Sequence, residues 1–492
     1  MSEFYRIKND FRLRGYELLP YAITYPAKGE VLFIRKEEFD ALSLCNGMID
    51  VTLPFIPKNL REMIPKFEEK GLIERCDRGE ELLPVQEYKK HPARFIRQAH
   101  WSITGGCNYR CKHCYMSAPD AKYGQLPHDT IMGMIDELHE CGVLNVSITG
   151  GEPLIRPDFL EIVDAFIERE IYIKQIYTNG ALVTRELLTE LDKRGIHPEF
   201  NMSYDGIGWH DWLRGVDGAE EAVDRAFLLC KEMGFPTGAE MCIHEKNKHT
   251  LRESMKHLGE VGCRGVKTNP ISDVGEWKKN GYKSVDIDEM YQLYLDYIPQ
   301  YYEDGMPLDL QLGGFFMASP TEPLSYDIPL YKNVKDPSKV TMCGHARQVM
   351  YISPEGRTLP CLSLSGMEVQ ERFPLIPDAG LSKCITDSFY MKMIDTRVSE
   401  YNEQHPDCEV CEYGRFCCGG CRASALGTSA DPYDLMAVDE ACCKLYRDGW
   451  AEKVMKLMHD IRSEAKTYAL NDIFWQKKTG ITQEKEKGET KK

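Results

Sequence analysis

The stretch FIRQAHWSITGGCNYRCKHC, residues 95–114, decides the fold, because a β-rich run leads directly into three closely spaced cysteines. Cys107, Cys111 and Cys114 are separated by three and then by two residues. A closed zinc site or an ordinary four-iron cluster takes four protein ligands, so a dense triple leaves one coordination position for another group. The stretch therefore predicts a strand that ends in a chemically active loop.

Five further β-rich runs follow this stretch, and helical patterns alternate with them. In one of these patterns, apolar residues recur at helical spacing, at Ile131, Met134, Ile135 and Leu138. Repeated βα units build a parallel sheet, and six units predict an α/β fold with a partial (β/α)6 TIM-like barrel. The further runs are LNVSI (144–148), IYIKQIY (171–177), EFNMSY (199–204), TGAEMCI (237–243) and GVKTNP (265–270).

Short polar motifs stand where the second, third and fourth strands are expected to end. They are TGGEP (149–153), TNG (178–180) and SYDG (203–206). Each alone is an ordinary turn signal, but barrels of this kind place their chemistry at the carboxyl ends of successive strands. The motifs together predict one site beside the cysteines.

The spacing CxxxCxxC and the GGEP motif resemble those of the radical S-adenosylmethionine enzymes, over about residues 97–300. The resemblance implies that Cys107, Cys111 and Cys114 are the catalytic residues and hold a 4Fe-4S cluster. In that family S-adenosylmethionine binds the fourth iron through its amino and carboxylate groups and is cleaved to methionine and a 5′-deoxyadenosyl radical. The cofactor would thus fill the coordination position that the three cysteines leave.

The other motif residues suit the binding of this cofactor. Glycines let the backbone approach the methionine amino group, a glutamate offers that group a carboxylate, and an arginine suits the methionine carboxylate. For the arginine, an exposed surface ion pair is the alternative. The predicted cofactor-binding residues are Gly150, Gly151, Glu152, Pro153, Thr178, Asn179, Ser203, Asp205 and Arg214.

Composition narrows the setting of this chemistry. The chain has 492 residues and a formal net charge of -16, which argues against nucleic acid or an anionic membrane surface as the main partner. It has no apolar signal core at its start and no apolar run long enough to span a bilayer, so a cytoplasmic location is predicted. In that reducing setting the 19 cysteines are expected to be metal ligands or thiols rather than disulfides.

A second group of cysteines occupies the last third of the chain. Its spacing resembles the SPASM domain, a C-terminal extension of radical S-adenosylmethionine enzymes that holds two auxiliary 4Fe-4S clusters. The resemblance implies one auxiliary cluster on Cys343, Cys361 and Cys421, and another on Cys408, Cys411, Cys417 and Cys443, with Cys442 as the alternative last ligand. A zinc ribbon on the four closely spaced thiolates is the structural alternative.

The first of these auxiliary clusters, which we call the inner cluster, again has three obvious ligands. Either Cys384 or Cys418 completes it, or one iron is open to a substrate thiolate. The chain would then carry three 4Fe-4S clusters in all, and it would need a reducing electron donor such as flavodoxin or ferredoxin.

The first 92 residues are expected to form a separate winged helix-turn-helix module. The run YAITYPAKGEVLFI (21–34) predicts a hairpin. Helices are expected over residues 36–47 and 58–71, and a strand follows. Residues 1–90 contain 15 Lys and Arg against 16 Asp and Glu, which disfavours DNA binding. The module resembles the domain that binds leader peptides in enzymes that modify ribosomal peptides, where an extended leader adds to an exposed sheet edge. A packing domain without a ligand is the alternative.

These parts predict a maturase of a ribosomally made precursor peptide that forms thioether crosslinks, as sactipeptide synthases do. Other radical peptide modifications, such as epimerisation or carbon–carbon crosslinking, are alternatives. Sulfatase maturation is a further alternative, but sulfatase maturases resemble one another in having Asp at the position where this chain has Leu362. An iron–sulfur electron carrier is the alternative from another class. The predicted divisions are the leader-binding module (1–92), the barrel (93–304), a bridging segment (305–342), the SPASM domain (343–475) and a disordered tail (476–492).

Overall fold

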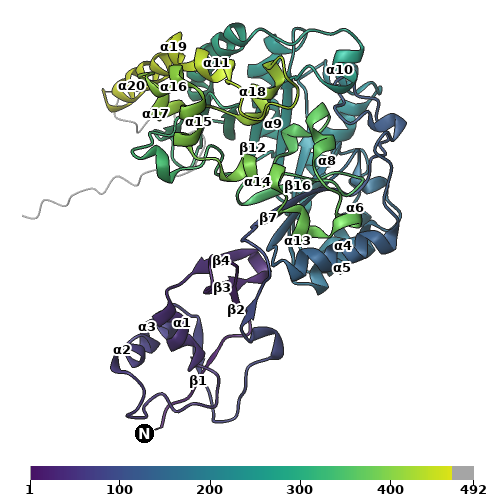
Figure 1. Ribbon diagram of the computed structural model, residues 1–492. Coiled ribbons are helices and arrows are strands. Elements are labelled where there is room, and N and C mark those ends of the chain that lie inside the picture. The colour runs from purple at the N-terminus through teal and green to yellow at the C-terminus, as the bar shows by residue number, and fades with distance from the viewer. Residues whose placement is uncertain (1, 468–492) are drawn as a thin grey trace, which may run out of the picture.

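Six parallel strands form the centre of an eleven-stranded sheet in the computed structural model, which describes residues 2–467 (Figure 1). Each of the six pairs with the next one in chain order. The two edge strands of the sheet do not pair with each other, so the barrel is open and the predicted partial-barrel fold is confirmed. The six strands are β7 (Gln98–Ser102), β8 (Asn145–Thr149), β9 (Tyr172–Thr178), β10 (Glu199–Ser203), β11 (Thr237–Ile243) and β12 (Gly265–Pro270).

Helices connect these strands and cover one face of the sheet (Figure 1). The predicted apolar positions of α4 are buried, and Gly142, Gly234 and Gly262 follow their helices with φ of 74°, 77° and 99°, a conformation in which a side chain would be strained. The helices are α4 (His128–Glu140), α5 (Phe159–Glu168), α6 (Arg185–Lys193), α7 (His210–Arg214), α8 (Ala219–Met233), α9 (Leu251–Val261), α10 (Gly275–Lys279) and α11 (Ile287–Glu303).

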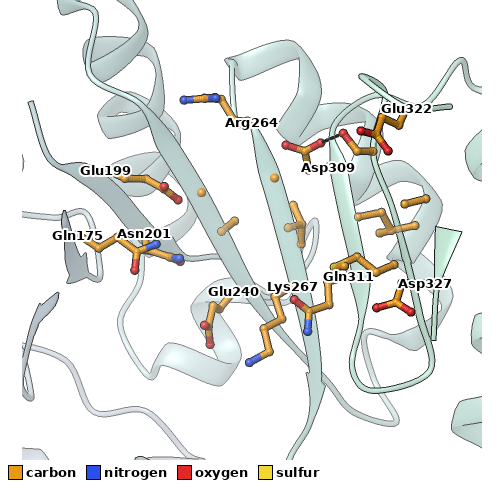
Figure 2. A pocket seen from close by; sticks show the side chains of 18 of the residues that line it. Gln175, Glu199, Asn201, Glu240, Arg264, Lys267, Asp309, Gln311, Glu322 and Asp327 are labelled. Atoms are coloured by element: carbon orange, nitrogen blue, oxygen red, sulfur yellow. Dashed lines mark hydrogen bonds between the residues drawn. The ribbon is translucent and has the colours of Figure 1, made fainter. Parts of the chain in front are cut away.

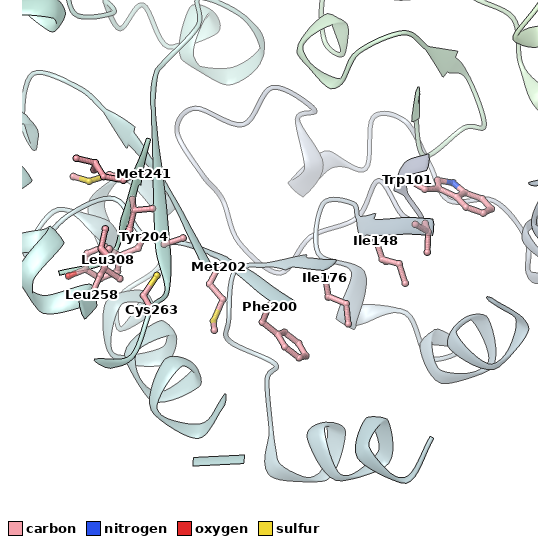
Figure 3. Close-up of a cluster of buried hydrophobic side chains, with 14 of the residues drawn as sticks. Trp101, Ile148, Ile176, Phe200, Met202, Tyr204, Met241, Leu258, Cys263 and Leu308 are labelled. Atoms are coloured by element: carbon pink, nitrogen blue, oxygen red, sulfur yellow. The ribbon is translucent and has the colours of Figure 1, made fainter. Parts of the chain in front are cut away.

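The main core lies between the strands and these helices (Figure 3). Trp101 of β7 meets Phe166 of α5 edge to face, with ring centroids 6.0 Å apart, and Ile148 of β8 and Phe200 of β10 are fully buried. Each such side chain removed from water stabilises the fold by about 2–3 kcal/mol. Because side chains alternate along a strand, the residues between these core positions point to the concave face of the sheet.

Residues 305–342, predicted as a bridge, extend this sheet beyond β12. β13 (Asp309–Leu312) pairs parallel to β12, and β14 (Phe316–Ala318) and β15 (Tyr326–Asp327) follow as antiparallel strands. On the other side of the sheet, β16 (Val349–Ile352) pairs parallel to β7, and β17 (Thr358–Leu359) pairs antiparallel to β16. The sequence after the barrel therefore completes both edges of the sheet.

The cysteine-rich territory continues as short helices around a second core that includes Tyr351, Tyr390 and Tyr401. The helices are α12 (Ile376–Ala379), α13 (Leu381–Cys384), α14 (Ser388–Asp395), α15 (Val398–Gln404), α16 (Pro406–Glu409), α17 (Gly414–Cys417), α18 (Arg422–Thr428), α19 (Glu440–Arg447) and α20 (Trp450–Thr467). The tail predicted to be disordered, residues 476–492, lies outside the described residues.

The N-terminal module has a core of its own, with Tyr5, Ile23, Leu42 and Phe67 buried in it. The predicted hairpin is β3 and β4, in a sheet of order β4-β3-β2-β6, while β5 pairs with β1. The segment 58–71, expected to be one helix, is divided into α2 and α3, and Pro65 lies in the first turn of α3, where a missing N–H is tolerated. The elements are β1 (Tyr5–Ile7), β2 (Arg12–Gly15), β3 (Ala22–Tyr25), β4 (Glu30–Phe33), α1 (Lys36–Ser43), α2 (Lys58–Arg61), α3 (Ile64–Glu69), β5 (Ile73–Arg75) and β6 (Lys89–Lys90).

This module contacts the barrel at the amino-terminal ends of β8 and β9. The Asn145 side chain donates to the Gly29 carbonyl at 3.3 Å, and the buried Tyr16 hydroxyl donates to the Gly142 carbonyl at 3.0 Å. Arg12 forms an ion pair of 2.6 Å with Glu170, just before β9. The module is therefore held at the end of the barrel opposite to the predicted site.

Candidate active site

The predicted motifs meet around a cavity of about 200 Å³ at the carboxyl ends of β8 to β10. Nine of the predicted residues line it, and three do not: Glu152, Pro153 and Asp205 are buried behind its wall. The lining residues are Cys107, Cys111, Cys114, Gly150, Gly151, Thr178, Asn179, Ser203 and Arg214.

The cysteine loop offers a donor set that fits an iron–sulfur cluster. The backbone N–H of Tyr109 donates to Cys107 Sγ at 3.4 Å, and that of Ala118 to Cys114 Sγ at 3.3 Å. Such donors stabilise a thiolate, but burial raises the pKa of Cys107 to about 12. The positive charge of bound iron is what would keep these thiols deprotonated.

The two glycines of TGGEP hold this loop against the cysteine loop. A Cβ on Gly151 would lie 2.1 Å from the carbonyl oxygen of Gly106, and one on Gly150 would lie 2.8 Å from that of Thr104. The N–H of Gly151 donates to the Thr104 carbonyl at 2.9 Å. Glycine is needed here because two backbones pass in contact, whatever ligand the cavity takes.

Glu152 joins the ends of β8 and β9 from beneath the cavity. Its carboxylate accepts hydrogen bonds from the Thr178 hydroxyl at 2.9 Å and from the Asn179 N–H at 2.8 Å. Burial raises its pKa to about 7, although these donors act in the opposite direction. In this structure the carboxylate positions the TNG turn.

Asp205 and Arg214 form a buried ion pair, with Arg214 Nε 2.6 Å from Asp205 Oδ2. Arg214 Nη1 also donates to Cys111 Sγ at 3.8 Å. Burial alone would raise the pKa of Asp205, but the charge of Arg214 holds that pKa well below its usual range. The surface ion pair considered for Arg214 is excluded, because the arginine is buried and lines the cavity.

Several lining residues were not predicted from the sequence. Tyr177, Asn201 and Glu240 are polar residues of β9, β10 and β11, and His113 lies inside the cysteine motif. The Nδ1 of His113 is buried without a hydrogen-bond partner among the described residues. Alternation of polar and apolar residues along the three strands was the available signal, since it marks the concave face.

Several of the C-terminal cysteines that the resemblance assigns to one set lie near one another. The pKa of Cys361 is raised to about 11 by burial and then by Cys421 and Cys343, which lie close enough to act on it. In the other set, Cys443 is influenced by Cys417 and Cys408. Cys442 is buried in the main core, whereas Cys443 is half-buried, so Cys443 is the more accessible of the adjacent pair.

Comparison with known proteins places the cavity in a family. Residues 101–258 match the sequence profile of the Radical SAM superfamily, and this span contains the cysteine loop, the TGGEP loop and β7 to β11 except for the first residues of β7. The chain carries a radical SAM domain. It is therefore an enzyme of the radical SAM type, and the cysteine loop lies within the matched residues.

The names of curated relatives of this radical SAM enzyme refer to different substrates and products. The PqqA peptide cyclase of Granulibacter bethesdensis is 25% identical over 350 residues, 70% of this chain and 86% of the relative. The AdoMet-dependent heme synthase of Methanosarcina barkeri is 24% identical over 364 residues, 71% and 96%. The subtilosin biosynthesis protein AlbA of Bacillus subtilis is 23% identical over 267 residues, 54% of each chain.

Among solved structures, Streptococcus suis SuiB bound to its precursor peptide SuiA has the same fold, with a TM-score of 0.62 and 18% identity. The match covers 90% of this radical SAM enzyme and 100% of SuiB. Residues 93–492 alone could not supply this share, so the common fold includes part of the N-terminal module. Among the described residues, no helix is both long and apolar enough to cross a membrane.

Proposed function

We propose that this radical SAM enzyme modifies a ribosomally made precursor peptide and forms thioether bonds between substrate cysteine sulfurs and substrate carbons. The observation that carries the proposal is a free strand edge on a module fixed to the barrel. β4 pairs with β3 alone among the described residues, and Leu32 and Phe33 on it are 51% and 39% exposed. An exposed edge with apolar side chains suits an extended peptide, which can add to it as another strand.

The backbone pattern shows which groups of β4 a leader would use. The N–H of Ile34 donates to the Tyr21 carbonyl, so these two residues form a hydrogen-bonded pair. Pairs alternate along an antiparallel ladder, and Val31 and Phe33 therefore direct their N–H and C=O groups to the free edge. A leader held there would enter the enzyme at the amino-terminal end of the barrel.

In the cavity, Cys107, Cys111 and Cys114 would hold the 4Fe-4S cluster, and S-adenosylmethionine would bind against Gly150, Ser203, Asn179 and Arg214. When bound, these groups supply a carbon radical that takes a hydrogen atom from the substrate. The role of the protein is to orient the substrate carbon and to keep other C–H bonds away. Glu152, Pro153 and Asp205 would act by positioning the residues that line the cavity.

Clusters on the C-terminal cysteines would accept the electron that thioether formation releases. Joining sulfur to the carbon radical releases one proton from the thiol and one electron, and auxiliary clusters on the two cysteine sets would accept that electron. Cys384 is buried in the barrel core, and the buried thiol of Cys418 donates to the Arg415 carbonyl at 3.4 Å. This supports an inner cluster with three protein ligands on Cys343, Cys361 and Cys421, and one iron free for a substrate thiolate.

The enzyme also needs an electron to start each cycle. We propose that an external reducing protein, such as flavodoxin or ferredoxin, supplies this electron. Arg110 and Lys112 within the cysteine loop would favour an acidic donor, in contrast to the net charge of -16 of the whole chain.

Sulfatase maturation is disfavoured by the cavity itself, because Leu362 lines it and can neither take nor give a proton. The relatives include a peptide cyclase and a heme synthase, so sequence similarity leaves the substrate class open. The free β4 edge therefore decides between a peptide and a small molecule in this proposal.

The test combines the reconstituted enzyme, S-adenosylmethionine, a reductant and each short cysteine-containing peptide encoded beside its gene. A thioether lowers the peptide mass by two hydrogens and makes one cysteine resistant to alkylation. Loss of two hydrogens with every cysteine still alkylated would indicate a carbon–carbon bond, and solvent deuterium gained at one carbon would indicate epimerisation. No change in any such peptide would contradict the proposed function.

A further inference from the structure

A larger cavity, of about 660 Å³, forms a groove on the concave face of the sheet (Figure 2). It runs across β9 to β15, and Tyr177, Asn201 and Glu240 line both this groove and the cofactor cavity. The two cavities therefore adjoin. The groove also reaches Glu199 and Gly265, the first residues of β10 and β12, and thus extends toward the end of the barrel where the N-terminal module is attached.

The floor of the groove is bare backbone at its centre. Gly238 and Gly265 are partners in the register of β11 and β12. A Cβ on Gly238 would lie 2.7 Å from the carboxylate of Glu199, and one on Gly265 would lie 3.0 Å from the Cβ of Asp309. The missing side chain of Gly238 thus lets the Glu199 carboxylate lie directly over the sheet, within the groove.

The lining of the groove is acidic. Carboxylates outnumber cationic side chains in its lining by five to two, with Glu199, Glu240, Asp309, Glu322 and Asp327 against Arg264 and Lys267. Glu199 and Glu240 are half-buried and form no ion pair within residues 2–467, and Glu240 accepts only a long hydrogen bond of 3.4 Å from Asn269. Half-buried carboxylates without a cation favour a ligand that brings one.

The two cationic side chains of the groove do not remove its preference for a basic ligand. Lys267 is the register partner of Glu240 but forms no ion pair with it in the described structure. Arg264 lies just before β12 and lines the groove but not the cofactor cavity. Glu199 lies over Gly238 in the floor of the groove, and Glu240 lines both the groove and the cofactor cavity.

We propose that this groove binds the segment of the substrate next to the modified residue, and that Glu199 and Glu240 select a lysine or arginine in that segment. The inference rests on the proposed function in taking the substrate to be a peptide. It adds a requirement on that peptide, a basic side chain at a set position, which neither the free β4 edge nor the cysteine sets impose. A peptide held at the β4 edge could pass through the groove to the cofactor cavity.

The experiment uses the immobilised, reconstituted full-length enzyme with S-adenosylmethionine and an mRNA-displayed library of random peptides. We expect lysine or arginine to be enriched about fivefold to tenfold at one position, as one charge pair in a partly buried groove would give. The double variant Glu199→Gln/Glu240→Gln should abolish the enrichment. The matched control Glu253→Gln/Glu260→Gln, which removes two exposed carboxylates from α9, should retain it.

The outcomes separate this inference from the proposed function. Selected peptides without a basic preference, or with one that survives in the double variant, would overturn the role of the two carboxylates and leave a peptide substrate intact. A library from which the native enzyme selects nothing would count against both. If the double variant fails to fold, two further measurements test the inference. The enrichment should be weaker with Glu199→Gln alone, and it should be weaker with the native enzyme in high salt, because salt screens a partly exposed ion pair. An unchanged enrichment in both measurements would overturn the inference.

Discussion

Cys111 lies where the cysteine loop meets the ion pair of Asp205 and Arg214. Replacing it with alanine removes one of three cluster ligands and leaves the C-terminal cysteines untouched. We expect Cys111→Ala to abolish reductive cleavage of S-adenosylmethionine, measured as 5′-deoxyadenosine by chromatography, while iron bound elsewhere is retained. Cys230→Ala, at a buried cysteine of α8 that lines neither cavity, is the control and should cleave normally. Normal cleavage by Cys111→Ala would remove this cysteine from the site.

A pH effect on stability is expected from Glu152, whose pKa is raised from 4.5 to about 7 by burial. Between these values the folded state holds a proton that the unfolded state has lost, so stability falls as the pH rises from 4.5 to 7. The loss is about 3 kcal/mol at most. In urea unfolding of the apoprotein, the native chain should lose more stability between pH 5 and 8 than Glu152→Gln, which cannot ionise. Equal losses in both proteins would show that Glu152 is not protonated in the folded state at pH 5.

At the scale of single elements, β4 is the strand on which the peptide proposal depends. Val31→Pro removes an N–H that points to the free edge and leaves the bonds to β3 intact, and proline is tolerated on edge strands. We expect precursor binding, measured by fluorescence anisotropy, to weaken at least about tenfold, as the loss of one or two strand hydrogen bonds would give. Uncoupled cleavage of S-adenosylmethionine should be unchanged.

The control for β4 is Val31→Ala, which shortens the side chain and retains the N–H. It should bind the precursor nearly as well as the native enzyme. If the proline and alanine variants bound equally, the leader would not be added to β4 as a strand.

At the scale of the whole molecule, the cysteine sets predict the metal content. The anaerobically purified enzyme should hold about twelve irons and as many sulfides per chain, four of each for three clusters. Iron and sulfide analysis tests this directly. About four irons would leave only the radical SAM cluster and would remove the proposed electron acceptors, and one zinc ion in their place would favour the zinc ribbon.

Much of this molecule could be predicted because its signals are local in the chain. The βα alternation, the apolar face of α4 and the glycines after α4 and α8 depend on the backbone conformation of neighbouring residues, so a single sequence displays them. The cysteine loop and TGGEP are likewise short segments at strand ends. The sequence by itself therefore determined the barrel, the position of its chemistry and the identity of nine cavity residues.

Other features depend on residues that are far apart in the chain, and only the tertiary structure decided them. Glu152 was expected to face the cofactor, but the hydrogen-bond donors of β9 turn its carboxylate away from the cavity. The burial of Cys442 beside the more accessible Cys443 follows from how α19 packs on the barrel. The acidic groove requires β10, β11, β12 and β13 to lie side by side in that order. The spacing of residues along the chain does not predict these contacts, because the packing of distant helices and strands decides which side chains become buried.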